Sequence, residues 1–132
     1  MNDCFEKTLF AVNEMRLLLT ERLAQLVACN QTTQTVKSLG ELLQLVEQIK
    51  VCVKLYYLDK ATKIVEHIAA NGFADASRVL KGADPSILNR SQFMAQATQR
   101  LVAIRSALAG DRIDCHGKHE VHKTTVTEDV FQ

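Results

Sequence analysis

The feature that most constrains the fold is the spacing of apolar residues, which recur every three or four positions through residues 1–110. This spacing gathers apolar side chains on one side of an α-helix. The chain has only one proline and five glycines, so few positions oppose helix formation. The sequence therefore predicts an all-α fold.

The first long segment runs from about Asp3 to Cys29. Asp3 and Glu6 form a capping-box pattern directly before the periodic residues. The spacing of the apolar residues is that of a heptad seam, widened enough for a bundle core. The predicted seam is Phe5, Leu9, Val12, Leu19, Leu23 and Leu26.

The second long segment covers residues 38–70. Ser38 and Glu41 repeat the capping pattern, although Val36 also fits a helix that begins a turn earlier. Asp59 could cap a separate helix, but no glycine or proline divides the segment, so we predict one long or kinked helix that stops at Asn71-Gly72. Its predicted stripe is Leu39, Leu42, Val46, Ile49, Val53 and Tyr56.

Shorter pieces follow, over residues 73–81 and 84–88, before a final helix that Ser91 caps and Gly110 ends. The predicted architecture is thus a bundle of about four main helical segments, with a short helical turn region before the last helix. The bundle domain covers residues 1–110, and residues 111–132 form a flexible or extended non-helical tail. The seam of the final helix is Met94, Ala97, Leu101, Ile104 and Leu108.

The composition argues against several classes of function. The formal net charge is +1 and aromatic residues make up 5%, so neither an attractive field nor a stacking platform for nucleic acid is expected. No apolar run approaches the roughly 20 residues needed to span a bilayer, and no targeting segment is visible. The four cysteines lack framework spacing, which favours reduced thiols in a cytoplasmic protein.

The tail contains a Cys/His cluster and a few apolar residues. Thiolate and imidazole bind zinc or nickel, so Cys115, His116, His119 and His122 are candidate metal ligands. Their spacing matches no common zinc motif, and a solvated tail without metal is the preferred interpretation. The apolar residues are candidate anchors for a partner protein: Val121, Val126, Val130 and Phe131.

No nucleophile elbow, phosphate-binding loop or paired-carboxylate pattern is present in the sequence. We therefore expect no enzyme and no obligatory cofactor. The favoured function is a small cytoplasmic interaction module, such as an adaptor, a chaperone-like factor or a regulator, which presents a helical surface to another protein and forms a homodimer. The alternatives are a metal-binding or metal-responsive protein that uses the tail cluster, and a helical DNA-binding regulator.

Overall fold

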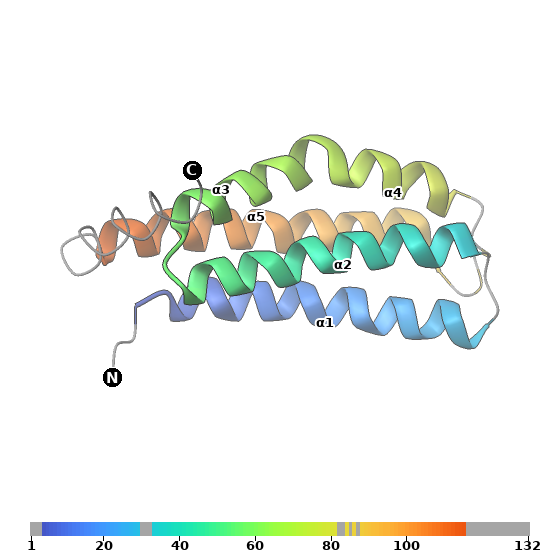
Figure 1. The fold of residues 1–132 in the computed structure, drawn as a ribbon. Coiled ribbons are helices and arrows are strands. Elements are labelled where there is room, and N and C mark those ends of the chain that lie inside the picture. Colours follow the sequence, from blue (N-terminus) through green and yellow to red (C-terminus); the bar gives the residue numbers. More distant parts are fainter. Residues whose placement is uncertain (1–3, 30–32, 82–83, 85, 87, 116–132) are drawn as a thin grey trace.

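The computed structural model describes residues 4–29, 33–81, 84, 86 and 88–115, and within them it shows an all-α bundle without strands (Figure 1). The elements are α1 (Glu6–Ala28), α2 (Thr33–Lys54), α3 (Leu58–His67), the π-helix η1 (Ile68–Gly72), α4 (Phe73–Leu80) and α5 (Arg90–Asp114).

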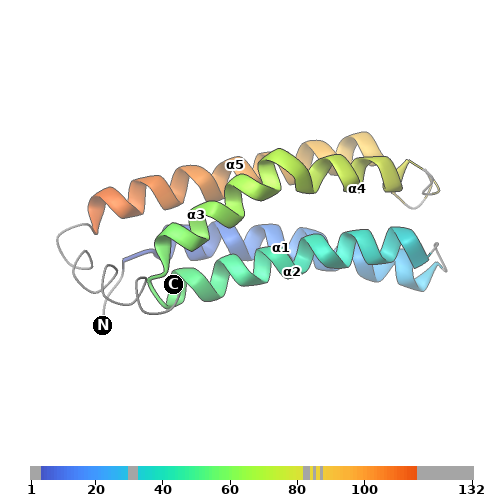
Figure 2. The same ribbon diagram turned by 45° about the horizontal axis from the view of Figure 1, so that its top comes forward.

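Four helical rods build the bundle. α1 and α2 lie side by side and antiparallel, and α3, η1 and α4 form one continuous arm that returns along α2 (Figures 1 and 2). α5 then runs back along α1, so that the end of α5 lies at the same end of the bundle as the start of α1 and the α2–α3 turn. The predicted all-α fold of about four main segments is confirmed.

The core includes most residues of the predicted seams. On α1, Val12, Leu19 and Leu26 are fully buried, while Leu9 and Leu23 are half-buried. On α2 and α5 the buried seam residues are Leu39, Leu42, Val46, Ile49, Val53, Ala97, Leu101, Ile104 and Leu108. Burial of each large aliphatic side chain contributes about 1.5–3 kcal/mol, so burial of these seams strongly favours folding.

The start of α1 differs from the prediction. The helix begins at Glu6, and Phe5 before it has a left-handed backbone with φ of 70° and provides no side-chain cap. A helix starting at Asp3 with an Asp3/Glu6 capping box is therefore wrong, and Asp3 itself lies outside the described residues. Phe5 is 2% exposed, so burial of its ring takes precedence over a local cap.

The cap of α1 comes instead from α5. Oδ2 of the buried Asp111 accepts hydrogen bonds from the backbone N–H of Thr8 at 3.0 Å and from the Thr8 hydroxyl at 2.7 Å. Thr8 is the third residue of α1, so its N–H has no partner within the helix. The carboxylate also interacts favourably with the positive end of the helix dipole. Asp111, 103 positions away from Thr8 in the sequence, thus caps the N-terminus of α1.

Residues 38–70 form two helices rather than one, and the first of them already begins at Thr33. The N–H of Tyr57 donates to the carbonyl of Cys52 at 2.8 Å, and that of Tyr56 to the carbonyl of Val53 at 3.1 Å. With φ of 60° at Tyr56, this pattern is a Schellman motif, whose left-handed position is usually glycine.

The single-helix prediction failed because the left-handed residue is a tyrosine. That conformation costs a residue with a Cβ atom about 1–2 kcal/mol. The ring of Tyr56 packs against the ring of Phe5, with centroids 6.1 Å apart, and this tertiary contact offsets the cost. Asp59 lies in the first turn of α3 but does not cap it, since the residue before the helix is Tyr57.

The predicted stop at Asn71-Gly72 is also wrong. The chain widens there into η1 and continues directly into α4. No glycine among the described residues has positive φ, so the left-handed helix end on which the prediction depended does not form. The segment predicted at 73–81 matches α4 closely.

Both ends of α5 differ from the prediction. Asn89, not Ser91, is the N-cap, and its side chain accepts a hydrogen bond from the N–H of Gln92 at 3.0 Å. Gly110 lies inside the helix, where a Cβ atom would meet nothing within 4 Å, and does not end it. The helix continues to Asp114, so the bundle extends past the predicted boundary at residue 110.

Two cysteines are not reduced thiols as predicted. Cys4 and Cys115 form a disulfide, and Cys115 is 4% exposed. Cys29 and Cys52 are free, the first exposed and the second buried. The disulfide joins the start of α1 to the end of α5, next to the hydrogen bonds between Thr8 and Asp111. None of the helices in the described ranges combines the length and the apolar character required to cross a bilayer.

We predict that Asp111→Ala lowers the free energy of unfolding by about 2–3 kcal/mol, because the Thr8 N–H and hydroxyl lose their acceptor in the core. Urea denaturation with the disulfide intact measures this change. Asp114→Ala, at an exposed position of the same helix, is the control and should change stability by less than about 0.5 kcal/mol. Equal effects of the two substitutions would contradict the capping role.

Candidate functional site

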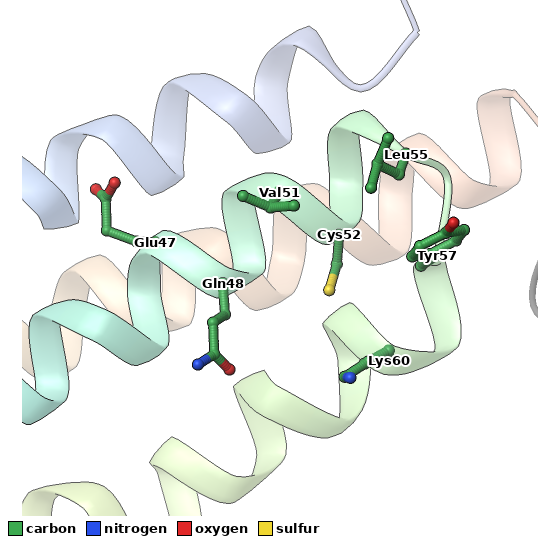
Figure 3. A pocket seen from close by; sticks show the side chains of 7 residues that line it. All are labelled: Glu47, Gln48, Val51, Cys52, Leu55, Tyr57 and Lys60. Atoms are coloured by element: carbon green, nitrogen blue, oxygen red, sulfur yellow. The ribbon is translucent and has the colours of Figure 1, made fainter. Parts of the chain in front are cut away.

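A groove with a volume of about 380 Å³ lies between α2 and α3. Figure 3 shows Gln48 and Cys52 directed from α2 toward α3, Lys60 on the facing helix, and Tyr57 at the turn. The lining is mostly apolar, with charge only at Glu47 and Lys60. The lining residues are Glu47, Gln48, Val51, Cys52, Leu55, Tyr57 and Lys60.

The position of the groove follows from the α2–α3 turn. The Schellman motif reverses the chain within three residues, so the last turn of α2 and the first turn of α3 lie face to face. Val51 and Leu55, four residues apart on α2, lie on one side of that helix. They remain 55% and 48% exposed, so the groove presents apolar side chains that the bundle leaves uncovered.

Cys52 contributes an apolar, unreactive surface to the groove. Burial raises the pKa of the Cys52 thiol above its ordinary value, and the charge of Lys60 opposes that rise only in part. The thiol is therefore protonated at neutral pH, and the protonated form is a poor nucleophile and a poor metal ligand. The groove is thus suited to binding an apolar group rather than to thiol chemistry.

Charged and polar groups mark the two ends of the groove. Glu47 lies toward the middle of α2, where Arg16 of α1 approaches it to 3.5 Å. Lys60 lies on the first turn of α3, close to the α2–α3 turn. An apolar ligand that also carries polar groups would therefore bind in a preferred direction.

A second, polar hollow of about 280 Å³ lies where α1 meets the start of α5. Arg22 donates to the side-chain carbonyl of Gln96 there, at 3.5 Å, and Gln25, Asn89 and Gln92 also line it. Its side chains are mainly amides, which hydrogen-bond well but perform no acid–base chemistry at neutral pH.

The predicted tail sites fall mostly outside the described residues. His116, His119 and His122 lie there, as do Val121, Val126, Val130 and Phe131. The structure places Cys115 in the disulfide with Cys4, so its sulfur is not available as a thiolate ligand while that bond exists. Among the described residues, no group of three or more potential ligands is arranged to hold a metal ion.

The groove has no distinctive signal in the amino-acid sequence. Cys52 and Leu55 are visible in the sequence only as apolar residues beside the α2 stripe, and such residues usually widen a core. Their place in the groove wall depends on the chain reversal at Tyr56, for which the sequence has no glycine signal. Comparisons with protein-family models, with curated proteins and with solved structures found no match for this chain.

We predict that alkylation of Cys52 by iodoacetamide is slow at neutral pH and still accelerates above pH 9, because burial raises the pKa of its thiol and only the thiolate reacts. The sign of the linkage is that of a raised pKa in the folded state. The contribution of the protonated thiol to stability is full below the unfolded-state pKa and is lost as the pH rises through the folded-state value. Peptide mapping of the modified protein measures the rate, and a plateau below pH 8 would contradict the prediction.

Proposed function

We propose that this protein is a small interaction module, an adaptor, chaperone-like factor or regulator, that binds another protein through the α2–α3 groove. The partner would insert one or two large apolar side chains from an amphipathic segment. The observation that supports this most directly is the partial exposure of Val51 and Leu55 beside a cavity of about 380 Å³. Cavities of roughly 300–1,000 Å³ are typical of sites that bind apolar groups.

The chemistry of the groove favours binding over catalysis. Its thiol is protonated, and its two charged side chains come from different helices at opposite ends of the lining. Mostly apolar walls with a few polar groups are what a helix-in-groove or peptide complex uses for affinity and direction. The metal-binding alternative would need the tail histidines without the Cys115 thiolate, so we do not favour it.

Self-association is a second part of the proposal. Phe10 and Leu17 of α1 are 67% and 47% exposed. They are seven residues apart, so they lie on one side of the helix. They face away from the buried Val12 and Leu19, and an apolar outer face on a long helix favours the expected homodimer.

The cellular compartment determines whether the Cys4–Cys115 disulfide persists. Disulfides persist in oxidising compartments, whereas in the cytosol they are usually transient and redox-sensing. If the protein is cytoplasmic, as we propose from the sequence, Cys4 and Cys115 would therefore cycle between the thiol and disulfide forms.

We predict that Val51→Asp weakens binding at the groove at least tenfold, because burying an unpaired carboxylate costs several kcal/mol and about 1.4 kcal/mol corresponds to a factor of ten. Titration with the apolar dye ANS measures the affinity of the groove for an apolar ligand. Quantitative affinity capture from a cell extract then compares how much partner protein the variant and the parent retain. Far-UV circular dichroism should show both variant and parent folded.

Val102→Asp is the matched control for the groove. Val102 is also 55% exposed but lies on α5, outside the lining. It should leave both dye binding and partner capture unchanged. Equal loss in the two variants, or loss in neither, would contradict the proposal.

We predict that Leu17→Asp makes the protein monomeric at tens of micromolar while its melting temperature changes little, since Leu17 is largely exposed within one chain. Placing a charge in an apolar contact between two chains is unfavourable. Light scattering of both proteins decides this. A monomeric parent protein would exclude self-association at that concentration.

A further inference from the structure

The disulfide and the groove lie at the same end of the bundle and are connected by packed residues. We infer that the redox state of Cys4 and Cys115 controls the groove between α2 and α3. The inference rests on the proposed binding function and adds its regulation. Three contacts carry it: the disulfide, the ring contact between Phe5 and Tyr56, and the turn that Tyr56 forms.

The first contact fixes the start of α1. Cys4 and Cys115 have Cα atoms 5.9 Å apart. Phe5 follows Cys4 directly, so the bond holds the residue that precedes α1 in place. Phe5 adopts φ of 70° with its ring 2% exposed. The disulfide is therefore positioned to maintain an unfavourable backbone conformation at Phe5.

The second contact carries that constraint to the turn. Phe5 and Tyr56 are the two non-glycine residues with positive φ in the part of the chain that the structure describes. Their rings lie 6.1 Å apart at an angle of 59°. A tilted aromatic pair of this kind is attractive beyond the area that it buries, so it helps to offset the cost of a left-handed residue.

The third contact connects the turn to the groove. Tyr56 stands between Leu55 and Tyr57, and both of these neighbours line the groove. The hydrogen bonds of the Schellman motif hold all three residues, with Tyr57 bonded to the carbonyl of Cys52, itself a lining residue. If Tyr56 leaves the left-handed conformation, these bonds break and the groove wall changes shape.

The redox step is ordinary thiol–disulfide exchange with a dithiol reductant. One thiolate of the dithiol attacks a sulfur of the Cys4–Cys115 bond and forms a mixed disulfide, and the other cysteine leaves as a thiolate. The second thiolate of the dithiol then displaces the remaining cysteine. The products are two protonated cysteine thiols and the oxidised dithiol, with two electrons transferred to the protein. The reverse reaction, with a disulfide oxidant, restores the bond.

Reduction is expected to loosen this end without separating the helices. The buried hydrogen bonds between Thr8 and Asp111 still hold α1 to α5. Arg112 still contacts Asp59 and Thr62, at 3.0 and 3.1 Å, which holds α5 to α3. The change is therefore confined to Phe5, the turn and the groove.

The test uses Cys52 as a reporter in the groove. Oxidised wild type and Cys4→Ser/Cys115→Ser both have the same two free thiols, the buried Cys52 and the exposed Cys29. Both full-length proteins are treated with iodoacetamide at one pH, and mass spectrometry gives the Cys52 rate relative to Cys29. We expect the ratio to rise about tenfold in the double variant, because a buried thiol reacts through local opening. A ratio within about twofold of the wild type would overturn the inference.

Two further full-length variants separate coupling from general loss of stability. Phe5→Ala keeps the disulfide but removes the ring contact, so it should raise the Cys52 ratio in the same direction. Leu26→Ala creates a cavity in the buried core at the opposite end of α1, lowers the stability of the whole bundle, and should leave the ratio unchanged. No effect of Phe5→Ala, or an equal effect of Leu26→Ala, would overturn the inference.

The outcome is independent of the proposed binding function. Dye binding that Val51→Asp abolishes, together with an unchanged Cys52 ratio, would retain the groove as a binding site and remove its redox control. A raised ratio in a protein whose groove binds neither dye nor partner would show the coupling and remove the binding function.

Discussion

The hydrogen bonds between Asp111 and Thr8 are the interaction on which the arrangement of the bundle depends most. They bury a carboxylate at the N-terminus of α1, where it replaces a local cap and interacts with the helix dipole. A buried carboxylate without such donors would be strongly unfavourable. These hydrogen bonds therefore help to specify the position of α5 along α1. The disulfide beside them repeats this specification covalently.

Because α1 and α5 are fixed at this end, the α2–α3 turn has a firm surface to pack against. Phe5 fills that position, and Tyr56 takes an unfavourable backbone conformation to contact it. The turn in turn places Leu55 and Tyr57 in the groove wall. One end of the bundle thus connects the Thr8–Asp111 hydrogen bonds, the Phe5–Tyr56 ring pair and the α2–α3 groove. The opposite end contains the polar hollow at Arg22.

The sequence predicted what depends on periodicity and missed what depends on distant contacts. The seams at Val12, Leu19, Val46 and Ile104 were visible because burial repeats every three or four residues. Tyr56 ends a helix only because Phe5 packs on it, and Asp111 caps α1 across 103 positions, so neither leaves a local signal. Gly72 and Gly110 carried a local signal that tertiary packing overrode. The groove was missed for the same reason, since it follows from Tyr56, and the tail candidates other than Cys115 lie outside the described residues.

Residues 4 and 115 lie close together, with Cα atoms 5.9 Å apart, so the chain between them ends next to where it begins. A short peptide linker between these positions could replace the disulfide, and the chain could then be opened elsewhere, because permuted chains are tolerated where exposed connections are cut. The connection between α4 and α5 is such a place, since Asp84 and Ser86 are exposed. A gene rearranged in this way would begin with α5 and end with α4, and its product would keep every helix pair of the native bundle.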